Sequence, residues 1–316
     1  MARIAVTGAT GFVGGTVAAV LADKGHEVTC LVRRDPGPDF PWPWQVVDSS
    51  DVGDLESALD GKDAVAHLAI LNDFALMYAD RRAGWDGYVG LTERVVAAAN
   101  VTGAQVAFIS SDWVFDGVGH LYPEDFPPNP VNYYGVLKVA SELVVLHQAD
   151  RGFVARVGGV QGLHQTKAHG PRLQDCGFGF FVLALVDSVR AGRRFTVWED
   201  PHINNVATPI VAPEIGALLG RGIDRGVDGI LHFAGATSVT RRELAMATCE
   251  AFDLDPGMVD FGPVPDEARL PAPVPFDTSM DGSRTMALLG TVAHPIEAQL
   301  RALAAEVETG RPVPLS

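Results

Sequence analysis

One glycine-rich segment near the start of the chain constrains its fold more than any other feature. It reads Thr7-Gly8-Ala9-Thr10-Gly11-Phe12-Val13-Gly14, follows an apolar run at Arg3 to Val6, and opens a helical pattern that reaches Lys24. Gly8 allows a tight turn, Gly11 lets the backbone approach a pyrophosphate, and Gly14 permits close packing of helix on sheet. The order strand, turn, helix predicts a dinucleotide-binding unit; the alternative is a glycine-rich turn that holds no ligand.

Such a turn holds phosphates through the backbone amides at the helix N-terminus and the positive end of the helix dipole. These local groups matter because the chain carries a net charge of −15, which does not attract anions. The residues of this turn that we expect to contact the cofactor are Gly8, Thr10, Gly11, Phe12, Val13 and Gly14.

The first half of the chain alternates short strand-like runs with longer helical patterns. Further strands are predicted at 28–32, 64–68, 106–109 and 153–157, and helices at 85–100 and 134–147. This alternation is typical of βαβ units with right-handed crossovers and a parallel sheet. We therefore predict an α/β fold, a Rossmann-type doubly wound parallel sheet with a smaller C-terminal substrate-binding lobe.

The domain boundary is expected near residue 160. Residues 1–160 would form the cofactor-binding domain with the catalytic residues, and residues 161–316 the substrate-binding lobe, with part of the chain returning to the sheet. Residues 162–177 are polar and contain glycine, so we expect a loop over the site. Further helices are predicted at 180–190, 213–221, 241–252 and 295–309, the last with Pro295 at its first helical position, and residues 263–275 as an extended connection.

Composition excludes several classes of function. The acidity of the chain argues against nucleic acid as a partner, because a phosphate backbone requires a basic surface. No apolar run is long enough to cross a bilayer, and Met1-Ala2-Arg3 leaves no room for a signal peptide before the first strand. The three cysteines are scattered, which fits a reducing compartment. We expect a cytoplasmic protein that binds neither nucleic acid nor membrane.

The second predicted strand ends at Arg33-Arg34, which bears on the choice of cofactor. A site selective for NAD(H) carries Asp or Glu here to accept from the ribose 2′-hydroxyl. Two arginines instead suit a 2′-phosphate, which favours NADP(H); the alternative is that they are solvated loop charges. Asp48 is placed to meet the adenine amino group, or else caps a helix or lies on the surface. We also expect Ser49 to contact the cofactor.

Tyr134-Gly135-Val136-Leu137-Lys138 carries the clearest catalytic pattern. Residues four apart lie on one face of a helix, so the phenol and the ammonium can enter one cleft. A nearby cation favours the phenolate, so we expect Lys138 to lower the pKa of Tyr134 and make it a usable proton donor. Lys138 can also hold the nicotinamide ribose. The alternative is a structural pair without chemistry.

Ser111 stands at the carboxyl end of the strand before that helix, where ligands bind in such sheets. Its hydroxyl can polarise a substrate carbonyl while Tyr134 protonates it. The residues after it, Asp112 and Trp113, are expected to contact the substrate. Alternatively, Ser110 or Ser111 only caps the strand end.

Together these motifs resemble the extended short-chain dehydrogenase/reductase family, and within it the dTDP-4-dehydrorhamnose reductase-like group. The glycine signature of the group corresponds to Thr7–Gly14, its Ser-Thr-Asp-Tyr-Val-Phe-Asp-Gly segment to Ser110–Gly117, and its Pro-x-Asn-x-Tyr-Gly-x-x-Lys segment to Pro130–Lys138. Asn205–Pro209 resembles its Gly-Thr-Pro turn and Gly229–Gly235 its late strand.

The resemblance implies that Ser111, Tyr134 and Lys138 form a catalytic triad, and that two copies of the chain dimerise through the helices predicted at 85–100 and 134–147. Residues implied to contact the cofactor are Ala69, Ile70, Gly158 and Gly159, and Asn72 is expected to contact the substrate. Trp113 replaces the usual Tyr beside the substrate. Loop 162–177 does not match the group; its His164 and His169 suggest surface or substrate-loop histidines rather than a metal site.

The leading hypothesis is an oxidoreductase that reduces a ketone with NADPH, acting on a nucleotide-linked 4-keto-sugar or a ketone of similar size. A second hypothesis is an NAD-dependent sugar-nucleotide epimerase or dehydratase, which Arg33-Arg34 and the absence of an acid at Trp113 disfavour. A third is an NADP-binding regulatory subunit without turnover, against which the intact triad residues count.

Overall fold

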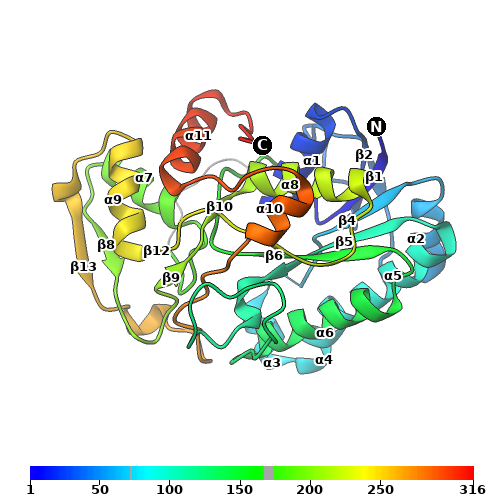
Figure 1. The fold of residues 1–316 in the computed structure, drawn as a ribbon, viewed down its shortest axis with the longest axis horizontal. Coiled ribbons are helices and arrows are strands. Elements are labelled where there is room, and N and C mark those ends of the chain that lie inside the picture. The colour runs from blue at the N-terminus through cyan, green and yellow to red at the C-terminus, as the bar shows by residue number, and fades with distance from the viewer. Residues whose placement is uncertain (72, 167–173) are drawn as a thin grey trace.

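A computed structural model gives the structure of residues 1–71, 73–166 and 174–316. In these residues the central sheet has seven strands in the order β11-β6-β5-β4-β1-β2-β3, and every neighbouring pair is parallel (Figure 1). The strands are β1 (Arg3–Thr7), β2 (Glu27–Val32), β3 (Trp44–Val46), β4 (Ala64–His67), β5 (Gln105–Ser111), β6 (Gly152–Val157) and β11 (Gly229–Phe233). This order confirms the predicted doubly wound α/β fold.

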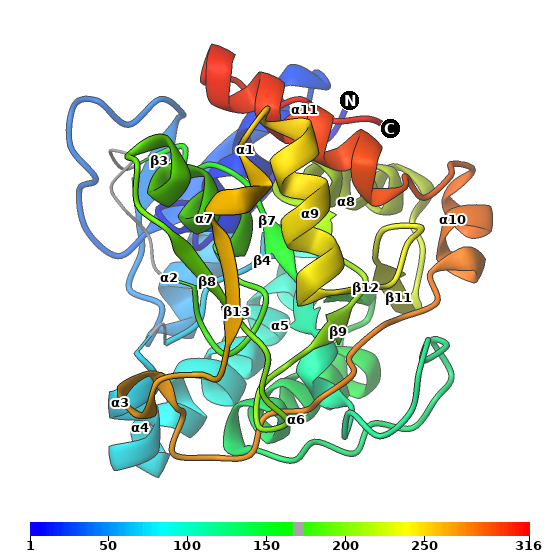
Figure 2. The ribbon, with the colours of Figure 1, turned by 90° about the vertical axis from the view of Figure 1, so that its left-hand side faces the viewer.

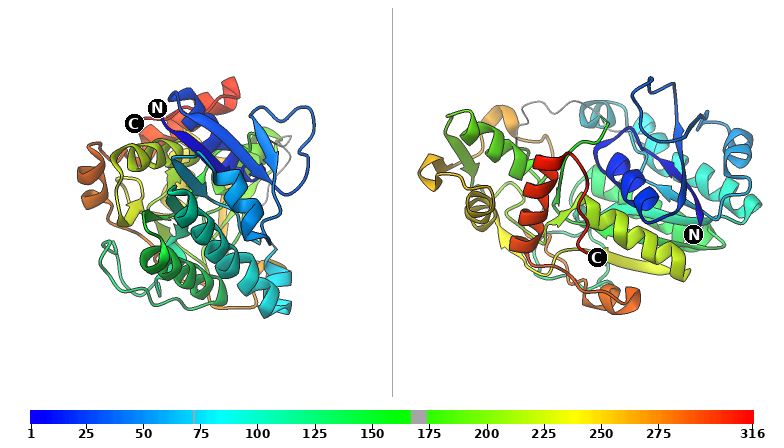
Figure 3. Two further views of the ribbon diagram at one scale, coloured as in Figure 1. Left: turned by 90° about the vertical axis from the view of Figure 1, so that its right-hand side faces the viewer. Right: turned by 90° about the horizontal axis from the view of Figure 1, so that it is seen from above.

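Helices cover both faces of the sheet. One face carries α1 (Phe12–Asp23), α8 (Ala212–Arg225) and α10 (Ser283–Leu289); the other carries α2 (Val52–Leu59), α5 (Leu91–Thr102) and α6 (Tyr133–Gln148). Successive strand residues point to opposite faces, so Ile4 and Val6 join the first core and Ala5 the second. Because both faces are covered, the interior strands β1, β4, β5 and β6 are buried along nearly their whole length. Figure 3 shows α1 and α8 side by side when the molecule is seen from above.

A smaller lobe lies at one end of the sheet and faces the viewer in Figure 2. Its core is formed by α7 (Phe181–Arg190), α9 (Arg241–Ala251) and α11 (Ile296–Thr309), with β8 (Phe195–Trp198) parallel to β13 (Val259–Gly262). Short strand pairs join the lobe to the sheet: β7 (Val160–Gln161) with β10 (Ile210–Val211), and β9 (Val206–Ala207) with β12 (Val239–Thr240).

The helix predicted at 85–100 is interrupted. It consists of α4 (Arg81–Trp85), a π-helical turn at Asp86–Gly90, and α5, and it follows another short helix, α3 (Phe74–Ala79). Gly87 in this turn permits the close approach of Leu71, because a β-carbon there would lie 2.6 Å from Cβ of Leu71. The Gly87 carbonyl accepts a hydrogen bond from the Leu71 amide at 3.2 Å, which connects the segment after β4 to the π-helical turn.

Other differences concern short elements. Pro295 is the N-cap of α11, which begins at Ile296 rather than at the proline. The segment predicted as an extended connection, 263–275, contains a 3₁₀ turn at Asp266–Ala268. The connection from β2 to β3 contains no helix among the described residues; Phe40 and Trp42 on it pack against the core, with ring centroids 5.4 Å apart. Among the described residues, no helix is both long and apolar enough to span a bilayer.

Candidate active site

The glycine-rich turn lies between β1 and α1, as predicted from its sequence. Gly8 has a φ of +74°, and a β-carbon on it would lie 2.8 Å from the amide nitrogen of Ala69. A β-carbon on Gly14 would overlap the Gly8 carbonyl, so only glycine lets α1 approach the turn this closely. The turn is therefore shaped by close backbone packing, as the sequence pattern implies.

The N-cap residue of α1 leaves the amides at the start of the helix without a side-chain cap. The N-cap residue, Gly11, has no side chain to accept from them, and the first turn of the helix carries no acidic residue. Thr10 is exposed, and Phe12 and Val13 are half-buried. A helix N-terminus with uncapped amides binds phosphate groups readily, so the residues present fit a dinucleotide.

Thr7 and His67 hold the ends of β1 and β4 together. The Thr7 hydroxyl accepts the amides of Leu68 and Ala69, each at 3.2 Å, and lies 2.8 Å from Nδ1 of His67. The Thr7 hydroxyl therefore donates its hydrogen bond to Nδ1 of His67, so the imidazole carries its own proton on Nε2. This arrangement fixes Ala69, an expected cofactor contact, directly beside Gly8.

The chain of hydrogen bonds continues on the other side of the imidazole. Nε2 of His67 lies 3.3 Å from the Thr92 hydroxyl, which donates to the Tyr88 carbonyl at 2.8 Å. Burial, and next the charge of Lys138, lower the pKa of His67 to about 3. The imidazole is therefore neutral, and its role is to order the backbone. Sequence analysis missed this chain because its members lie far apart in the sequence.

The three proposed catalytic residues come from β5 and α6. Ser111 ends β5, and Asn132 caps α6 by accepting the Gly135 amide at 2.9 Å, which places Tyr134 in the first helical turn. Lys138, one turn later, is buried and donates to the Ile109 carbonyl at 2.9 Å. The hydroxyls of Ser111 and Tyr134 interact.

Aromatic rings surround the half-buried Tyr134. Its ring centroid is 5.3 Å from that of Phe74, 6.0 Å from that of Tyr88 and 5.8 Å from that of Trp113. Trp113 therefore lies beside the proposed proton donor, where the sequence placed a substrate contact. Phe74 and Tyr88 were not predicted as neighbours, because the π-helical turn and α3 that position them were not foreseen.

The pKa values of the pair differ from the sequence-based expectation. Burial raises the pKa of Tyr134 to about 12; the Ser111 hydrogen bond lowers it and the charge of Asp112 raises it. The expected lowering by Lys138 is wrong for this state of the protein, since the ammonium bonds to the Ile109 carbonyl and lies 6.0 Å from the Tyr134 ring centroid. Burial lowers the pKa of Lys138 to about 8, against the opposing charge of Glu142.

Asp112 is turned inward. It is 4% exposed, and its two oxygens accept from Ser111 Oγ at 3.0 Å and from Thr278 Oγ1 at 2.6 Å. Burial raises its pKa to about 6, although those hydrogen bonds oppose the change. Asp112, expected to contact substrate, thus orients the hydroxyl of Ser111, which also accepts the Trp113 amide at 3.2 Å.

The other predicted cofactor residues are spread around the carboxyl ends of the strands. Arg33 and Arg34 are exposed just after β2. Asp48 is exposed and accepts both the amide and the hydroxyl of Ser50, which lower its pKa, and the Ser49 carbonyl accepts from Arg94 at 2.8 Å.

Ile70 is half-buried in the second core beside Ala69. Gly159 has a φ of +48°, and a β-carbon on Gly158 would lie 3.5 Å from an oxygen of Asp112. Asn72 lies outside the described residues.

The described part of loop 162–177 lies partly on the glycine-rich turn. Thr166 donates to the Thr10 carbonyl at 3.2 Å, and the Leu163 carbonyl accepts from Thr16 at 3.4 Å. Gln165 donates to buried Glu306 of α11 at 2.9 Å. His169 lies outside the described residues, within which no group of three or more His, Cys, Asp or Glu side chains could hold a metal.

Arg241 is a further residue that sequence analysis missed. It is buried and donates to the carbonyls of Asn204 at 2.7 Å, Asp175 at 2.9 Å and Gly177. A β-carbon on Gly177 would lie 3.3 Å from the Trp113 ring, so Arg241 holds this segment against Trp113. A charged residue at a helix start gives no sequence signal for such a role.

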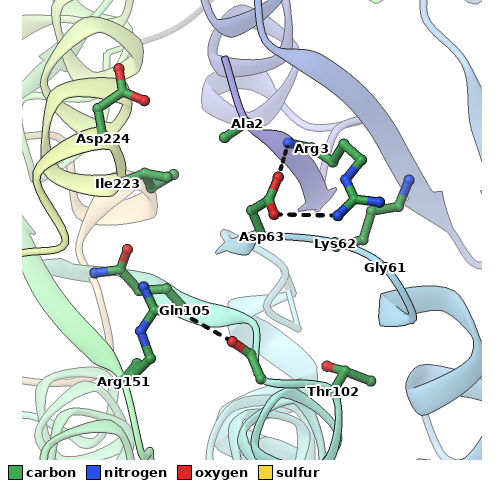
Figure 4. A pocket seen from close by; sticks show the side chains of 11 residues that line it. Ala2, Arg3, Gly61, Lys62, Asp63, Thr102, Gln105, Arg151, Ile223 and Asp224 are labelled. Atoms are coloured by element: carbon green, nitrogen blue, oxygen red, sulfur yellow. Dashed lines mark hydrogen bonds and ion pairs between the residues drawn. The ribbon is translucent and has the colours of Figure 1, made fainter.

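A cavity of about 430 Å³ lies at the opposite edge of the sheet (Figure 4). It is lined by residues at the amino ends of the strands, where Arg3 and Asp63 form an ion pair at 3.4 Å. Ligands of such sheets bind at the carboxyl ends of the strands. This cavity is therefore separate from the candidate active site.

Comparisons with known proteins agree with the fold and the motifs. The family model described as "RmlD substrate binding domain" matches residues 2–309. Methionine adenosyltransferase 2 subunit beta of Xenopus tropicalis is 27% identical over 309 residues, covering 89% of this chain and 81% of that protein. The dTDP-4-dehydrorhamnose reductase of Mycolicibacterium smegmatis is 31% identical over 294 residues, covering 90% and 79%.

Among solved structures, the dTDP-4-dehydrorhamnose reductase from Bacillus anthracis str. Ames in complex with NADP is similar. Its TM-score is 0.78 at 19% identity, over 96% of this chain and 99% of that one. At this identity the likeness shows the shared fold.

Proposed function

Because this chain belongs to the RmlD substrate binding domain family of extended short-chain dehydrogenases/reductases, we propose that it is an NADPH-dependent ketone reductase. One observation carries the proposal: Ser111 and Tyr134 meet at the carboxyl edge of the sheet, with Lys138 one helical turn from the phenol. The uncapped amides of α1 lie at the same edge, where a dinucleotide is expected.

The chain's own residues account for the proton in this reaction. NADPH, when bound, supplies the hydride that adds to the carbonyl carbon. Tyr134 donates its phenolic proton to the carbonyl oxygen, which yields an alcohol, and solvent then restores the proton. A pKa of about 12 keeps Tyr134 protonated at neutral pH, as a general acid requires.

Ser111 is held in place by its neighbours. Its hydroxyl donates to Asp112 and accepts from the Trp113 amide, so it must turn its proton toward a bound ketone before it can polarise the carbonyl. Lys138, anchored on the Ile109 carbonyl, would hold the nicotinamide ribose with its remaining donors.

We assign the cofactor as NADP(H) from the charge after β2. Arg33 and Arg34 are exposed, and no carboxylate stands in the position that accepts from a 2′-hydroxyl. Guanidinium groups pair with phosphate through two parallel hydrogen bonds, which suits a 2′-phosphate.

The proposed substrate is a nucleotide-linked 4-keto-sugar or a ketone of similar size. Support comes from the relative named dTDP-4-dehydrorhamnose reductase, which covers 90% of this chain. We also propose a homodimer formed through α5 and α6; α5 exposes Val101, and α6 exposes Val136 and Leu143.

The test is consumption of NADPH, followed by absorbance, with dTDP-4-dehydrorhamnose and a panel of other ketones. Turnover that depends on a ketone supports the proposal. Binding of NADPH without turnover on any ketone contradicts it.

A second candidate is an NADP-binding regulatory subunit of another enzyme. The observation that favours it is the likeness to methionine adenosyltransferase 2 subunit beta over 89% of the chain. Co-elution of this protein with a methionine adenosyltransferase, and a change in that enzyme's activity, would support this candidate; no complex at micromolar concentrations would count against it.

A further inference from the structure

The Tyr88 hydroxyl stands out among the buried polar atoms. Tyr88 lies in the π-helical turn at Asp86–Gly90 and is 2% exposed. Its hydroxyl has no hydrogen-bond partner within the described residues. A buried phenol without a partner costs free energy, so native proteins rarely leave one unsatisfied. π-Helical turns inside helices also occur frequently at functional sites.

The ring of Tyr88 faces the proposed catalytic pair. Its centroid is 5.8 Å from Nζ of Lys138 and 6.0 Å from the ring centroid of Tyr134, which it meets edge to face. Nζ of Lys138 also lies 5.1 Å from the ring centroid of Phe108. The Lys138 ammonium is thus enclosed by aromatic rings.

Lys138 has N–H donors without a hydrogen-bond acceptor. An ammonium group has three donors, and the described residues provide one acceptor for them, the Ile109 carbonyl at 2.9 Å. Tyr88 has an unused oxygen on the ring beside this ammonium. A water molecule can join two polar groups that are too far apart for a direct bond.

We propose that the Tyr88 hydroxyl is a positioning group for Lys138, joined to its ammonium through one bridging water. With one donor on Ile109 and one directed to Tyr88, a third donor remains for the nicotinamide ribose. The catalytic meaning of this arrangement rests on the proposed reductase function, but the contact itself can be tested without turnover.

The other titratable groups around Lys138 do not supply the second acceptor for its ammonium. Glu142, one turn further along α6, raises the pKa of Lys138 but is bound by Arg156 at 2.8 Å. His67 on β4 is neutral, and Tyr134 keeps its proton up to about pH 12. Tyr88 is itself held neutral, because burial raises its pKa. It therefore acts as a neutral acceptor that favours the ammonium form of Lys138.

The experiment is an NMR titration of the lysine side chains in the Tyr88→Phe variant, which removes one oxygen and keeps the ring. The sequence contains four lysines, Lys24, Lys62, Lys138 and Lys167, so ¹³Cε and ¹⁵Nζ signals are few and Lys138→Met assigns the one of interest. We expect the pKa of Lys138 to fall by roughly half a unit or more in Tyr88→Phe, since an acceptor for the charged form is lost. Tyr133→Phe is the matched control, because its hydroxyl donates to the Arg81 carbonyl at 2.7 Å, away from Lys138.

An unchanged Lys138 titration in Tyr88→Phe overturns the proposal, whether or not the protein reduces ketones. If that variant does not fold, the wild-type protein answers the question through the ¹³Cζ signal of Tyr88. The chemical shift of that signal should change with pH over the range in which Lys138 titrates, and this change should be absent in Lys138→Met. A chemical shift that does not change with the Lys138 titration overturns the proposal. Where a ketone substrate is found, the alkaline limb of kcat in Tyr88→Phe should move to lower pH, with NADPH affinity within about threefold of wild type.

Discussion

At the scale of single residues, the proposed chemistry depends on a phenol that keeps its proton. Burial raises the pKa of Tyr134 to about 12, and the Ser111 hydrogen bond opposes this only in part. A protonated phenol suits ketone reduction, which consumes the proton. The oxidation of an alcohol needs the phenolate instead, so the protonated phenol agrees with reduction as the proposed direction.

Replacing Tyr134 with Phe should lower kcat by about 10²- to 10⁴-fold, because a positioned general acid is lost. NADPH affinity should stay within about threefold, since the phenol takes no part in phosphate binding. Steady-state kinetics and fluorescence titration measure the two effects. Tyr133→Phe serves as the control with full activity, and retained turnover in Tyr134→Phe would show that another group is the acid.

Replacing Arg33 and Arg34 together with Ala should weaken NADPH binding by roughly 10-fold or more, since charge-assisted hydrogen bonds to the 2′-phosphate are lost. NADH binding should change little. Removing the exposed Arg284 and Arg301 changes the net charge equally and controls for the general field. Equal losses for both nucleotides would refute the assignment of these arginines.

The sequence could predict on which elements the candidate residues lie but not their hydrogen bonds. The spacing of Tyr134 and Lys138 indicated one helical face, and the structure shows them there. The inward turn of Asp112 could not be predicted, because its partner Thr278 comes from a distant segment. The pKa of Tyr134 was predicted in the wrong direction, because burial, which dominates it, is a property of the folded chain.

At the scale of elements, the contact between the glycine-rich turn and α1 is the tightest part of the site. Gly14→Ala would place a β-carbon against the Gly8 carbonyl and push α1 outward. We expect a loss of about 1–3 kcal/mol in the free energy of unfolding, together with weaker NADPH binding. Urea denaturation and nucleotide titration check this. In the control Gly262→Ala, the nearest atom is at an ordinary 3.4 Å, and equal stability of the two variants would contradict the packing argument.

Long periodic helices were predictable to within a few residues, as α6, α7 and α9 show. Short elements were not. β3 has three residues and α10 seven, and neither is long enough to show a period. The π-helical turn depends on the close approach of Leu71 to Gly87, a contact between distant residues. The positions of Tyr88 and Phe74 beside Tyr134 were therefore not predicted, because these residues lie on the π-helical turn and on α3.

At the scale of the whole molecule, one buried carboxyl links the lobe to the segment that lies on the glycine-rich turn. Glu306 of α11 is 0% exposed and accepts from Gln165, two residues from the carbonyl that Thr16 contacts. Burial raises its pKa from 4.5 to about 8. The folded protein thus holds this proton more tightly than the unfolded chain does.

The contribution of protonated Glu306 to the free energy of unfolding is fully present below about pH 4.5 and is lost as the pH rises through about 8. Glu306→Gln keeps an oxygen acceptor for Gln165 and removes the titration. Wild type should lose stability relative to this variant between pH 5 and pH 8, by on the order of 3 kcal/mol. Urea denaturation at both pH values measures the difference, and parallel pH profiles would show that Glu306 does not titrate in this range.

The strand order has a consequence for the time course of synthesis. β11 and α8 are made after α7 and β8 of the lobe, yet they cover the open edge of β6 and the apolar face of α1. Until residue 233 has left the ribosome, the emerging chain carries an unpaired strand edge beside an uncovered apolar surface. The sheet therefore closes only late in translation. A pause of the ribosome within the lobe would leave this strand edge and this apolar surface exposed for longer.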